Sequence, residues 1–278
     1  MNSRLKYSVN SFSYYQSLYN GNFTIYDYIK ESAKLKCSEL DPWFGHFTEI
    51  DSSSSEISEK ELIYLENVRA YAEMNQLLFQ LITVDGETYI YDSKPEKREQ
   101  NQQNAKKWIE IARILGAKGV RFDASRPEET IELDEDVLSI ICTGFRSLIE
   151  YGKKRGVSIY IENHYGLTRK PVDMIRILDS IPDLYYLFDS WNWEHKLVAQ
   201  GWLSCAKRAS AVHIKTFHIK ENNEDLLINL PSLLQLLDES GFEGCLTIET
   251  MPLSLEQERE LINNTLNLIK LLRRESNE

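Results

Sequence analysis

Two kinds of hydrophobic pattern alternate along the chain. Short runs of consecutive apolar residues predict strands buried on both faces, because a half-exposed strand would alternate apolar and polar positions. Mainly apolar runs of this kind lie at residues 77–84, 120–122, 157–161, 185–188, 211–212 and 245–248, and two shorter segments of mixed character, 7–12 and 37–40, are also predicted to be strands. Longer segments between them predict amphipathic helices, and these lie at 24–36, 58–74, 105–115, 134–155, 171–180, 193–208, 230–240 and 254–274.

Eight strand–helix units in succession predict a parallel sheet closed into a (β/α)8 TIM barrel of the α/β class. The length of 278 residues fits one such barrel, for which ~250 residues is typical. No linker rich in Pro, Gly or Ser separates two halves, so residues 1–278 are expected to form a single domain. In this fold the carboxyl ends of all strands meet at one rim, where ligands bind.

Four of the predicted strands are followed directly by a side chain suited to metal binding or acid–base chemistry. These side chains are Glu162, Asp189, His213 and Glu249. Each pair is separated by enough residues for a helix and two loops, so the four strand ends should be neighbours on one rim. A carboxylate at that rim is placed for chemistry, whereas one on an outer helix would only be solvated.

Three carboxylates held together repel one another unless a cation neutralises them. Carboxylate oxygens and one imidazole suit Mn²⁺, Mg²⁺ or Co²⁺, and they are also compatible with Zn²⁺. Four protein ligands leave positions on an octahedral ion for two substrate oxygens or waters. The sequence therefore predicts one divalent metal ion bound by these four residues. The alternative is that they only form hydrogen bonds within the rim.

Other polar residues near the predicted strand ends are candidates for substrate contacts. Glu39 and His46 flank the mouth of the second strand, where they would form hydrogen bonds with a substrate, although His46 fits a surface loop equally well. The polar segment 85–95 is long for a loop between a strand and a helix, so we expect it to act as a lid or to contact substrate.

Three further residues lie close to the predicted ligands. His164 either faces the pocket as a substrate ligand or caps a loop. Lys215 lies on the same strand face as the histidine ligand, where it would polarise a substrate oxygen or pair with the last glutamate. Arg121 is expected to pair with a neighbouring barrel carboxylate rather than to bind an anionic substrate.

Composition and charge narrow the classes of partner. With 32 Lys and Arg against 43 Asp and Glu, the formal net charge is −11, which disfavours nucleic acid because phosphate backbones are bound by clustered basic residues. No apolar run is long enough to span a membrane, and the amino-terminal six residues lack the apolar segment of a signal peptide. Four cysteines without C-x-x-C spacing favour a reduced, cytoplasmic protein.

The chain resembles the sugar phosphate isomerases/epimerases of the xylose isomerase-like TIM barrels over nearly its whole length. Each motif is weak alone, but their order is specific for the superfamily. The motifs are Glu39-Leu40, Lys107-Trp108-Ile109, Leu115-Gly116-Ala117, Val120-Arg121, Ile161-Glu162-Asn163-His164, Phe188-Asp189, Val212-His213-Ile214-Lys215 and Gly244-Cys245-Leu246-Thr247-Ile248-Glu249.

The resemblance implies that the four strand-end residues bind one divalent metal and that Glu162 and Glu249 also exchange protons with substrate. A small-molecule carbohydrate would be the partner, and a homo-oligomer is compatible with the family. The chain departs from the family at three positions: Asn192 replaces a frequent His and would take its place in substrate binding, and Thr216 and Ile219 replace an Asp and an Arg. These departures leave the substrate open.

The expected function is therefore metal-dependent isomerisation or epimerisation of a sugar, a polyol-derived ketone or a sugar phosphate, by proton transfer through an enediolate. A lyase that dehydrates a hydroxylated cyclic ketone would use the same residues. A phosphodiesterase resembling endonuclease IV would need more histidine ligands than the 5 His of this chain supply. A non-catalytic sugar-binding barrel conflicts with the intact ligand set.

Overall fold

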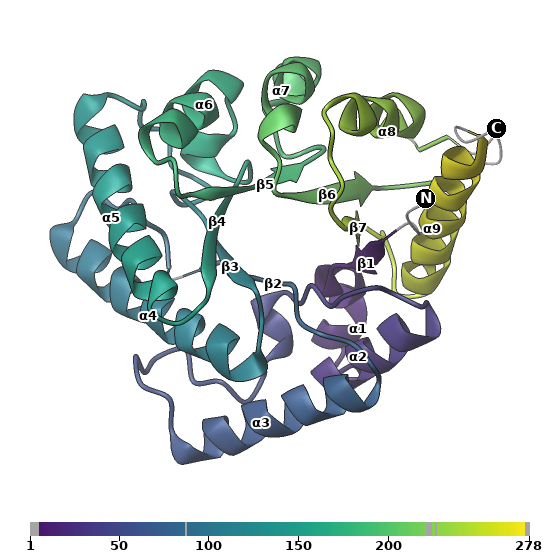
Figure 1. Ribbon diagram of the computed structural model, residues 1–278, viewed down its shortest axis with the longest axis horizontal. Helices are drawn as coiled ribbons and strands as arrows, with labels where there is room; N and C mark the ends of the chain where they lie inside the picture. The colour runs from purple at the N-terminus through teal and green to yellow at the C-terminus, as the bar shows by residue number, and fades with distance from the viewer. Residues whose placement is uncertain (1–5, 87, 221–223, 226, 276–278) are drawn as a thin grey trace.

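The computed structural model describes residues 6–86, 88–220, 224–225 and 227–275. Seven parallel strands lie side by side in the order β1-β7-β6-β5-β4-β3-β2, and Figure 1 looks down on this ring with the helices outside it. The strands are β1 Tyr7–Val9, β2 Leu81–Thr83, β3 Gly119–Phe122, β4 Ser158–Glu162, β5 Tyr185–Asp189, β6 Ala211–Thr216 and β7 Leu246–Thr250.

A short extended segment closes the barrel between β1 and β2 in place of a regular eighth strand. It makes single parallel bridges, which join Leu40 to Phe79, Asp41 to Asn10 and Trp43 to Thr83. The predicted strand at 37–40 is therefore wrong in its bounds, because the pairing residues lie at 40–43. A regular ladder does not form here, since Pro42 has no N–H to donate and the N–H of Asp41 donates to Tyr28 Oη at 2.8 Å.

Helices connect the strands and cover the outside of the sheet. They are α1 Tyr15–Tyr19, α2 Ile25–Lys34, α3 Glu59–Met74, α4 Pro95–Leu115, α5 Glu135–Lys153, α6 Pro171–Ser180, α7 Val198–Cys205, α8 Leu230–Glu239 and α9 Gln257–Glu275. The predicted helix at 193–208 is shorter than expected, because 3-10 turns at His195–Leu197 and Ala206–Arg208 flank α7. The other seven predicted helices are confirmed, although α4 begins earlier than predicted.

Side-chain caps fix where two of these helices begin. Thr24 and Asp27 form a reciprocal capping box at α2, and Ser58 and Glu61 form another at α3. Each box satisfies amide groups of the first turn that have no partner inside the helix. Gly116 ends α4 with φ +73°, a conformation that glycine adopts without steric cost.

The inside of the barrel changes from apolar to polar along the strands. Leu81, Tyr160 and Leu187 form a small buried cluster in contact with Ala211. Residues two positions further along a strand lie on the same face, and in β4, β5 and β6 these residues are Glu162, Asp189 and His213. The apolar cluster therefore lies directly below the candidate ligands inside the barrel.

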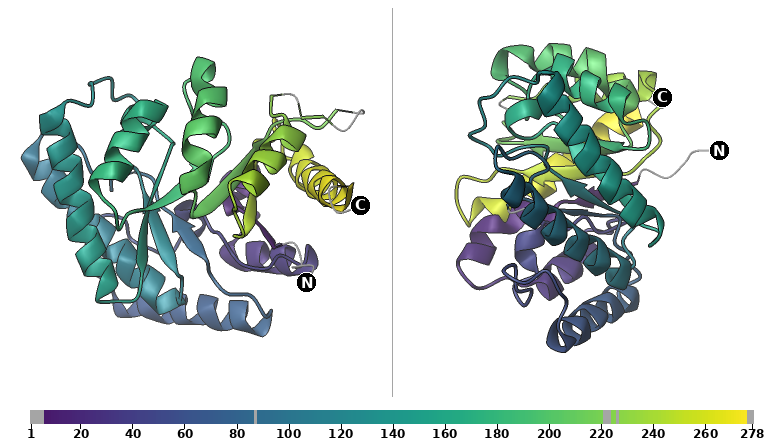
Figure 2. Two further views of the ribbon diagram at one scale, coloured as in Figure 1. Left: turned by 45° about the horizontal axis from the view of Figure 1, so that its top comes forward. Right: turned by 90° about the vertical axis from the view of Figure 1, so that its left-hand side faces the viewer.

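The last helix packs back against the first elements of the barrel. Glu258, at the start of α9, is buried and accepts hydrogen bonds from both the backbone N–H and the hydroxyl of Ser17 in α1. The side views in Figure 2 show α9 beside the amino-terminal elements. Within the described ranges, no helix combines the length and the apolar composition needed to cross a bilayer.

Candidate metal centre at the carboxyl ends of the strands

The four predicted ligands converge. Glu162, Asp189, His213 and Glu249 each offer one ligand atom, these atoms all lie within 4.8 Å of one another, and all four residues are buried. They come from β4, β5, β6 and β7, which are consecutive neighbours in the sheet. The convergence follows from the parallel pairing, since Asp189 is in register with His213, and Lys215 with Glu249.

The imidazole of His213 lies between two carboxylates. Its Nδ1 is 3.1 Å from Glu249 Oε2, and its Nε2 is 3.1 Å from Asp41 Oδ2. Burial alone would lower the pKa of His213, but Asp41 and Glu249 outweigh this effect and raise the pKa well above its ordinary value. The protonated ring donates to both carboxylates, and a cation among the ligands would displace the proton on Nδ1 while Asp41 keeps the one on Nε2.

Lys215 supplies a fixed positive charge beside the ligands. Its Nζ donates to Asn192 Oδ1 at 2.9 Å and lies 3.4 Å from Asp189 Oδ2 and 3.5 Å from Glu249 Oε2. Burial would lower the pKa of Lys215, but the surrounding carboxylates raise it. The ammonium therefore stays charged and is part of the site.

The two glutamates have opposite electrostatic environments. Burial raises the pKa of Glu249, but Lys215 and His213 outweigh it and hold this pKa below its ordinary range. At Glu162 burial dominates over Arg121, and the pKa is raised. Carboxyls whose pKa values are pushed apart are a common arrangement for an acid and a base acting on one substrate.

Buried carboxylate oxygens that no described donor satisfies support a metal at this site. Asp189 Oδ1 accepts from the backbone N–H groups of Trp191 and Asn192, at 2.7 and 2.8 Å, whereas Asp189 Oδ2 has only the ion pair with Lys215 at 3.4 Å and no hydrogen-bond partner among the described atoms. Glu162 Oε2 lies 2.9 Å from Arg121 Nε as an ion pair but outside hydrogen-bond geometry. Oxygen ligands of this kind with one imidazole suit a divalent cation such as Mn²⁺, Mg²⁺ or Co²⁺, so the residues fit the metal that was expected.

A network of side chains behind the ligands holds the ends of β4 and β5 together. Asn163 Oδ1 accepts from the backbone N–H of Asp189 at 2.9 Å and from Tyr186 Oη at 2.6 Å, and its Nδ2 donates to the carbonyl of Asp189. This pairing fixes the positions of two neighbouring ligands. This network was not predicted from the sequence, although Asn163 directly follows the candidate ligand Glu162.

A second cluster of polar side chains lies next to the four candidate ligands. It was not predicted from the sequence as a cluster. Asp85, Asp123 and His164 surround Arg121, and their ligand atoms also lie within 4.8 Å of one another. His164 Nδ1 is 3.1 Å from Asp123 Oδ1, and Trp43 Nε1 donates to Asp85 Oδ2 at 2.8 Å. The expected pairing of Arg121 with barrel carboxylates is confirmed. A signal was present, because Asp85 and Asp123 both follow predicted strands directly.

The predicted substrate-binding residues divide into two sets. Asn192 and Lys215 lie at the candidate metal centre, where Asn192 Nδ2 donates to Glu162 Oε1 at 3.3 Å, and His164 lies beside it in the group around Arg121. His46 is fully buried, has its Nδ1 2.9 Å from Ser11 Oγ, and packs against aromatic rings. It is therefore not a surface-loop residue, and it lies behind the mouth rather than among the ligands.

Glu39 does not reach this end of the barrel. Its carboxylate pairs with Lys118 at 2.9 Å, and Lys118 immediately precedes β3. The neighbouring Ser38 donates its N–H to the carbonyl of Tyr7 at the start of β1. The segment pairs at residues 40–43 rather than 37–40, so Asp41 occupies the place at the mouth that was predicted for Glu39.

The polar segment at 85–95 is anchored rather than free, and its Glu87 lies outside the described residues. Ile90 and Tyr91 donate backbone hydrogen bonds to the carbonyls of Asp123 and Ala124, at 3.1 and 2.7 Å. Both side chains are buried. The segment extends the wall of the mouth, and its role as a lid or a substrate contact stays a prediction.

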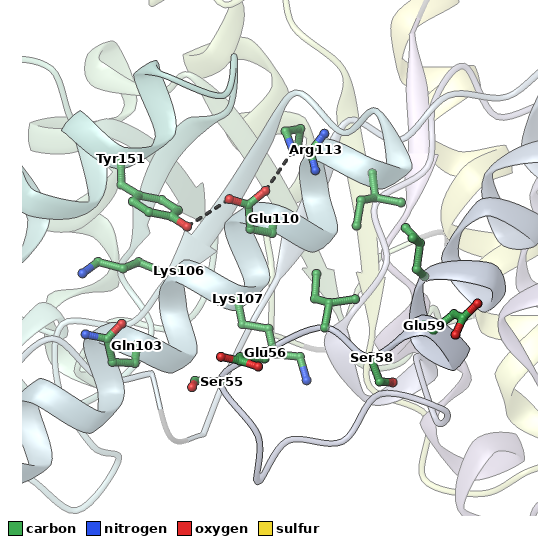
Figure 3. A pocket seen from close by; sticks show the side chains of 13 residues that line it. Ser55, Glu56, Ser58, Glu59, Gln103, Lys106, Lys107, Glu110, Arg113 and Tyr151 are labelled. Atoms are coloured by element: carbon green, nitrogen blue, oxygen red, sulfur yellow. Dashed lines mark hydrogen bonds and ion pairs between the residues drawn. The ribbon is translucent and has the colours of Figure 1, made fainter.

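A separate surface pocket lies on the outside of the barrel, between α3, α4 and α5. Its volume is about 680 Å³, and its lining includes Ser58, Lys106, Glu110, Arg113 and Tyr151. Figure 3 shows the Glu110 carboxylate directed at both Arg113 and Tyr151, which donate to it at 2.8 and 2.9 Å. None of the predicted metal ligands or substrate contacts lines this pocket, so we place the chemistry at the barrel mouth instead.

Solved structures similar to this chain include sugar epimerases, at low sequence identity. The D-allulose 3-epimerase of Methylomonas sp. superposes with a TM-score of 0.74 and 13% identity, covering 97% of this chain and 98% of that chain. The 3-keto-D-glucoside 4-epimerase of E. coli gives 0.71 and 14%, covering 95% and 99%. A D-tagatose 3-epimerase-like protein gives 0.67 and 16%, covering 96% and 98%. At such identities the likeness establishes the fold alone.

Sequence comparisons give the family. No curated protein matches the chain significantly. The family model described as xylose isomerase-like TIM barrel matches residues 31–271, a region that includes all four candidate ligands and seven of the eight barrel positions. The chain therefore belongs to the xylose isomerase-like TIM barrel family.

Proposed function

We propose that this protein is a divalent-metal-dependent epimerase or isomerase of an unphosphorylated ketose or polyol-derived ketone. The observation that carries the proposal is the pair Glu162 and Glu249, which belong to one buried ligand cluster and have pKa values shifted in opposite directions. Strands β5 and β6 separate the strands that bear them. A substrate bound between the two carboxylates would be reached from two faces.

The residues of this chain would have separate roles in the reaction. Glu249, ionised beside Lys215, removes the proton from the carbon next to the ketone, and Glu162 returns a proton from the other face. Lys215 and Asn192 orient the substrate oxygens, and the Lys215 ammonium holds positive charge where negative charge develops. When bound, the divalent cation supplies further positive charge at those oxygens. Asp41 keeps His213 in place.

The charge of the site supports a neutral substrate. Both fixed cations at the mouth are already engaged, since Arg121 pairs with three carboxylates and Lys215 lies near two. A phosphate dianion beside these groups would meet an excess of carboxylates, whereas sugar hydroxyls would find hydrogen-bond acceptors. The E. coli and Methylomonas proteins with the same fold are named for epimerisation of a 3-keto-glucoside and of D-allulose, which are also unphosphorylated sugars.

The test is proton exchange on a panel of ketoses. Protein loaded with Mn²⁺ would be incubated in deuterated solvent with neutral ketoses and with their phosphates, and products would be followed by NMR after the metal is removed. We expect deuterium at one carbon of a neutral ketose, together with its epimer or isomer. Exchange confined to phosphorylated sugars would overturn the substrate class. A product absorbing in the ultraviolet would identify a dehydratase.

Two variants separate the roles of the glutamates. Glu249→Gln keeps an oxygen ligand but cannot accept a proton, so epimerisation should fall by on the order of 10²–10⁴ while slow solvent exchange through Glu162 persists. Glu162→Gln should behave in the mirror sense with the epimeric substrate. Glu239→Gln, exposed on α8, is the control. Near-normal turnover in both site variants with metal bound would show that the bases lie elsewhere.

A further inference from the structure

The guanidinium of Arg121 lies at the centre of a group of buried carboxylates. Its Nη1 is 2.7 Å from Asp85 Oδ1 and 3.0 Å from Asp123 Oδ2, and its Nε is 2.9 Å from Glu162 Oε2. Arg121 is only 3% exposed. One permanent positive charge therefore forms ion pairs with three carboxylates at a position that solvent barely reaches.

The surroundings of this guanidinium have the composition of a metal site. Asp85, Asp123 and His164 bring ligand atoms within 4.8 Å of one another, as the four residues of the neighbouring metal centre do. His164 is held there by Asp123, its Nδ1 lying 3.1 Å from Asp123 Oδ1. Asp123 Oδ2 has no hydrogen-bond partner among the described atoms, so this carboxylate depends on the charge of Arg121.

Glu162 is shared between the two groups. Its Oε1 accepts from Asn192 and lies 3.9 Å from His213 Nδ1 in the metal centre. Its Oε2 faces Arg121. A carboxylate with one oxygen directed at each group is the geometry by which two metal ions are bridged in two-metal sites, where the ions lie about 3.5–4 Å apart. Here a metal would lie on one side and a guanidinium on the other.

We propose that Arg121 occupies the place of a second cation and thereby restricts the mouth of the barrel to one divalent ion. The guanidinium places a permanent positive charge against Asp85, Asp123 and Glu162, because arginine does not lose its proton in proteins. A second divalent ion among these carboxylates would stand in contact with that charge. The inference rests on the metal centre of the proposed function and concerns how many ions it holds.

One ion and two ions support different chemistry. A single metal with open positions can hold two adjacent oxygens of a ketose, whereas a metal pair stabilises the attacking and leaving oxygens of an in-line displacement at phosphorus. By restricting the site to one ion, Arg121 would leave it without the metal pair that such a displacement uses. It acts as a positioning residue for Glu162, and it does not need to touch the substrate.

The experiment counts Mn²⁺ ions. Metal-free full-length protein would be titrated with Mn²⁺, with bound metal measured by elemental analysis and the electronic state by electron paramagnetic resonance. The wild type should bind about one equivalent with the signal of an isolated ion. Arg121→Ala should bind about two, with the signal loss typical of a spin-coupled pair. Arg121→Lys, which keeps the charge, should remain at one.

Two controls locate the extra ion. Arg126→Ala removes an arginine that pairs with Asp92 outside the cluster, and it should still bind one equivalent. The double variant Arg121→Ala with Asp123→Asn should return from two equivalents to one. Circular dichroism and thermal unfolding confirm that each variant is folded. If Arg121→Ala does not fold, Arg121→Gln replaces it, and the wild-type count still tests the proposal directly.

The outcomes separate this inference from the proposed function. Two equivalents in the wild type, reduced to one by His164→Ala, would overturn the inference and leave the first metal centre standing. One equivalent in folded Arg121→Ala and Arg121→Gln would also overturn it. No metal in the wild type, with uptake of one ion by Arg121→Ala, would instead refute the proposed function and leave the role of Arg121 supported.

Discussion

Asp41 acts on the metal centre through another residue. It is buried, accepts from Asn10 Nδ2 at 3.2 Å, and lies 3.1 Å from the ring nitrogen of His213 that faces away from the other ligands. A carboxylate in this position selects the tautomer and orientation of a ligating imidazole and raises its basicity. The strength of metal binding should therefore depend on a residue that is not a ligand.

Asp41→Asn should raise the dissociation constant for Mn²⁺ by about 10- to 100-fold, because the neutral amide no longer supports His213. Isothermal titration of metal-free protein measures this change. Glu39→Gln is the matched control, since it lies two residues earlier and pairs with Lys118 at the other end of the barrel. Equal affinities for wild type and Asp41→Asn would remove the role assigned to Asp41. Weakened Mn²⁺ binding by Glu39→Gln would instead indicate that Glu39 lies at the mouth, as predicted from the sequence.

The sequence was sufficient to predict that the four candidate ligands lie together, but not which residues support them. Each ligand follows an unbroken apolar run, so its strand and its end could be recognised locally. Asp41 follows a stretch with little apolar character, and Glu39 and Asp41 share a face two residues apart. Only the pairing of Asp41 with Asn10 decides which of them stands at the mouth. The group around Arg121 likewise depends on the register between β2 and β3.

At the scale of elements, a buried ion pair joins α3 to α4. Lys107 Nζ lies 2.8 Å from Glu61 Oε1, and Glu61 also completes the capping box with Ser58 and accepts from the N–H of Asp51. Burial raises the pKa of Glu61, but the donors around it outweigh burial and lower the pKa from 4.5 to about 2. The outer helices are thus held by a carboxylate that must remain ionised.

This pKa shift predicts an acid-dependent loss of stability. A carboxyl with a depressed pKa in the folded state stabilises the protein above its unfolded pKa, and this contribution is lost as pH falls from about 4.5 toward 2. The shift corresponds to about 3 kcal/mol of unfolding free energy. Glu61→Gln should be destabilised at pH 7, and its deficit relative to wild type should narrow as the pH falls below 4.5.

Urea unfolding at several pH values measures that deficit. Glu59→Gln is the matched control, because Glu59 lies in the same first turn but is exposed, and its stability should follow the wild type. A deficit for Glu61→Gln that stays constant between pH 7 and pH 3.5 would show that the ionisation of Glu61 does not contribute in the way described.

At the scale of the whole molecule, charge distinguishes a sugar enzyme from a nuclease of related fold. The net charge is −11, and the two cations at the mouth are engaged by carboxylates. Binding to a phosphate backbone requires basic groups that release counterions. The surface and the site therefore both oppose polyanions. The formation of a homo-oligomer by this barrel stays a prediction.

Labelled duplex DNA should show no appreciable binding at physiological salt, measured by fluorescence anisotropy with the protein at micromolar concentration. The same measurement at low salt serves as the control for weak electrostatic attraction, which would disappear as salt is added. Micromolar or tighter binding at physiological salt, together with strand cleavage in the presence of Mn²⁺, would favour the phosphodiesterase.

Single bridges, rather than a continuous ladder, close the barrel between β1 and β2, and we call this stretch the seam. Residues 40–43 hold β1 to β2 without a continuous ladder, so local opening should begin there, and opening would carry Asp41 away from His213. A ligand that binds only the closed ring opposes such opening by mass action. Amide hydrogens along the seam should therefore exchange sooner than those of β6 and β7 in metal-free protein, and Mn²⁺ should slow them most. Hydrogen-exchange mass spectrometry would then detect the ion at a segment that supplies none of its ligands.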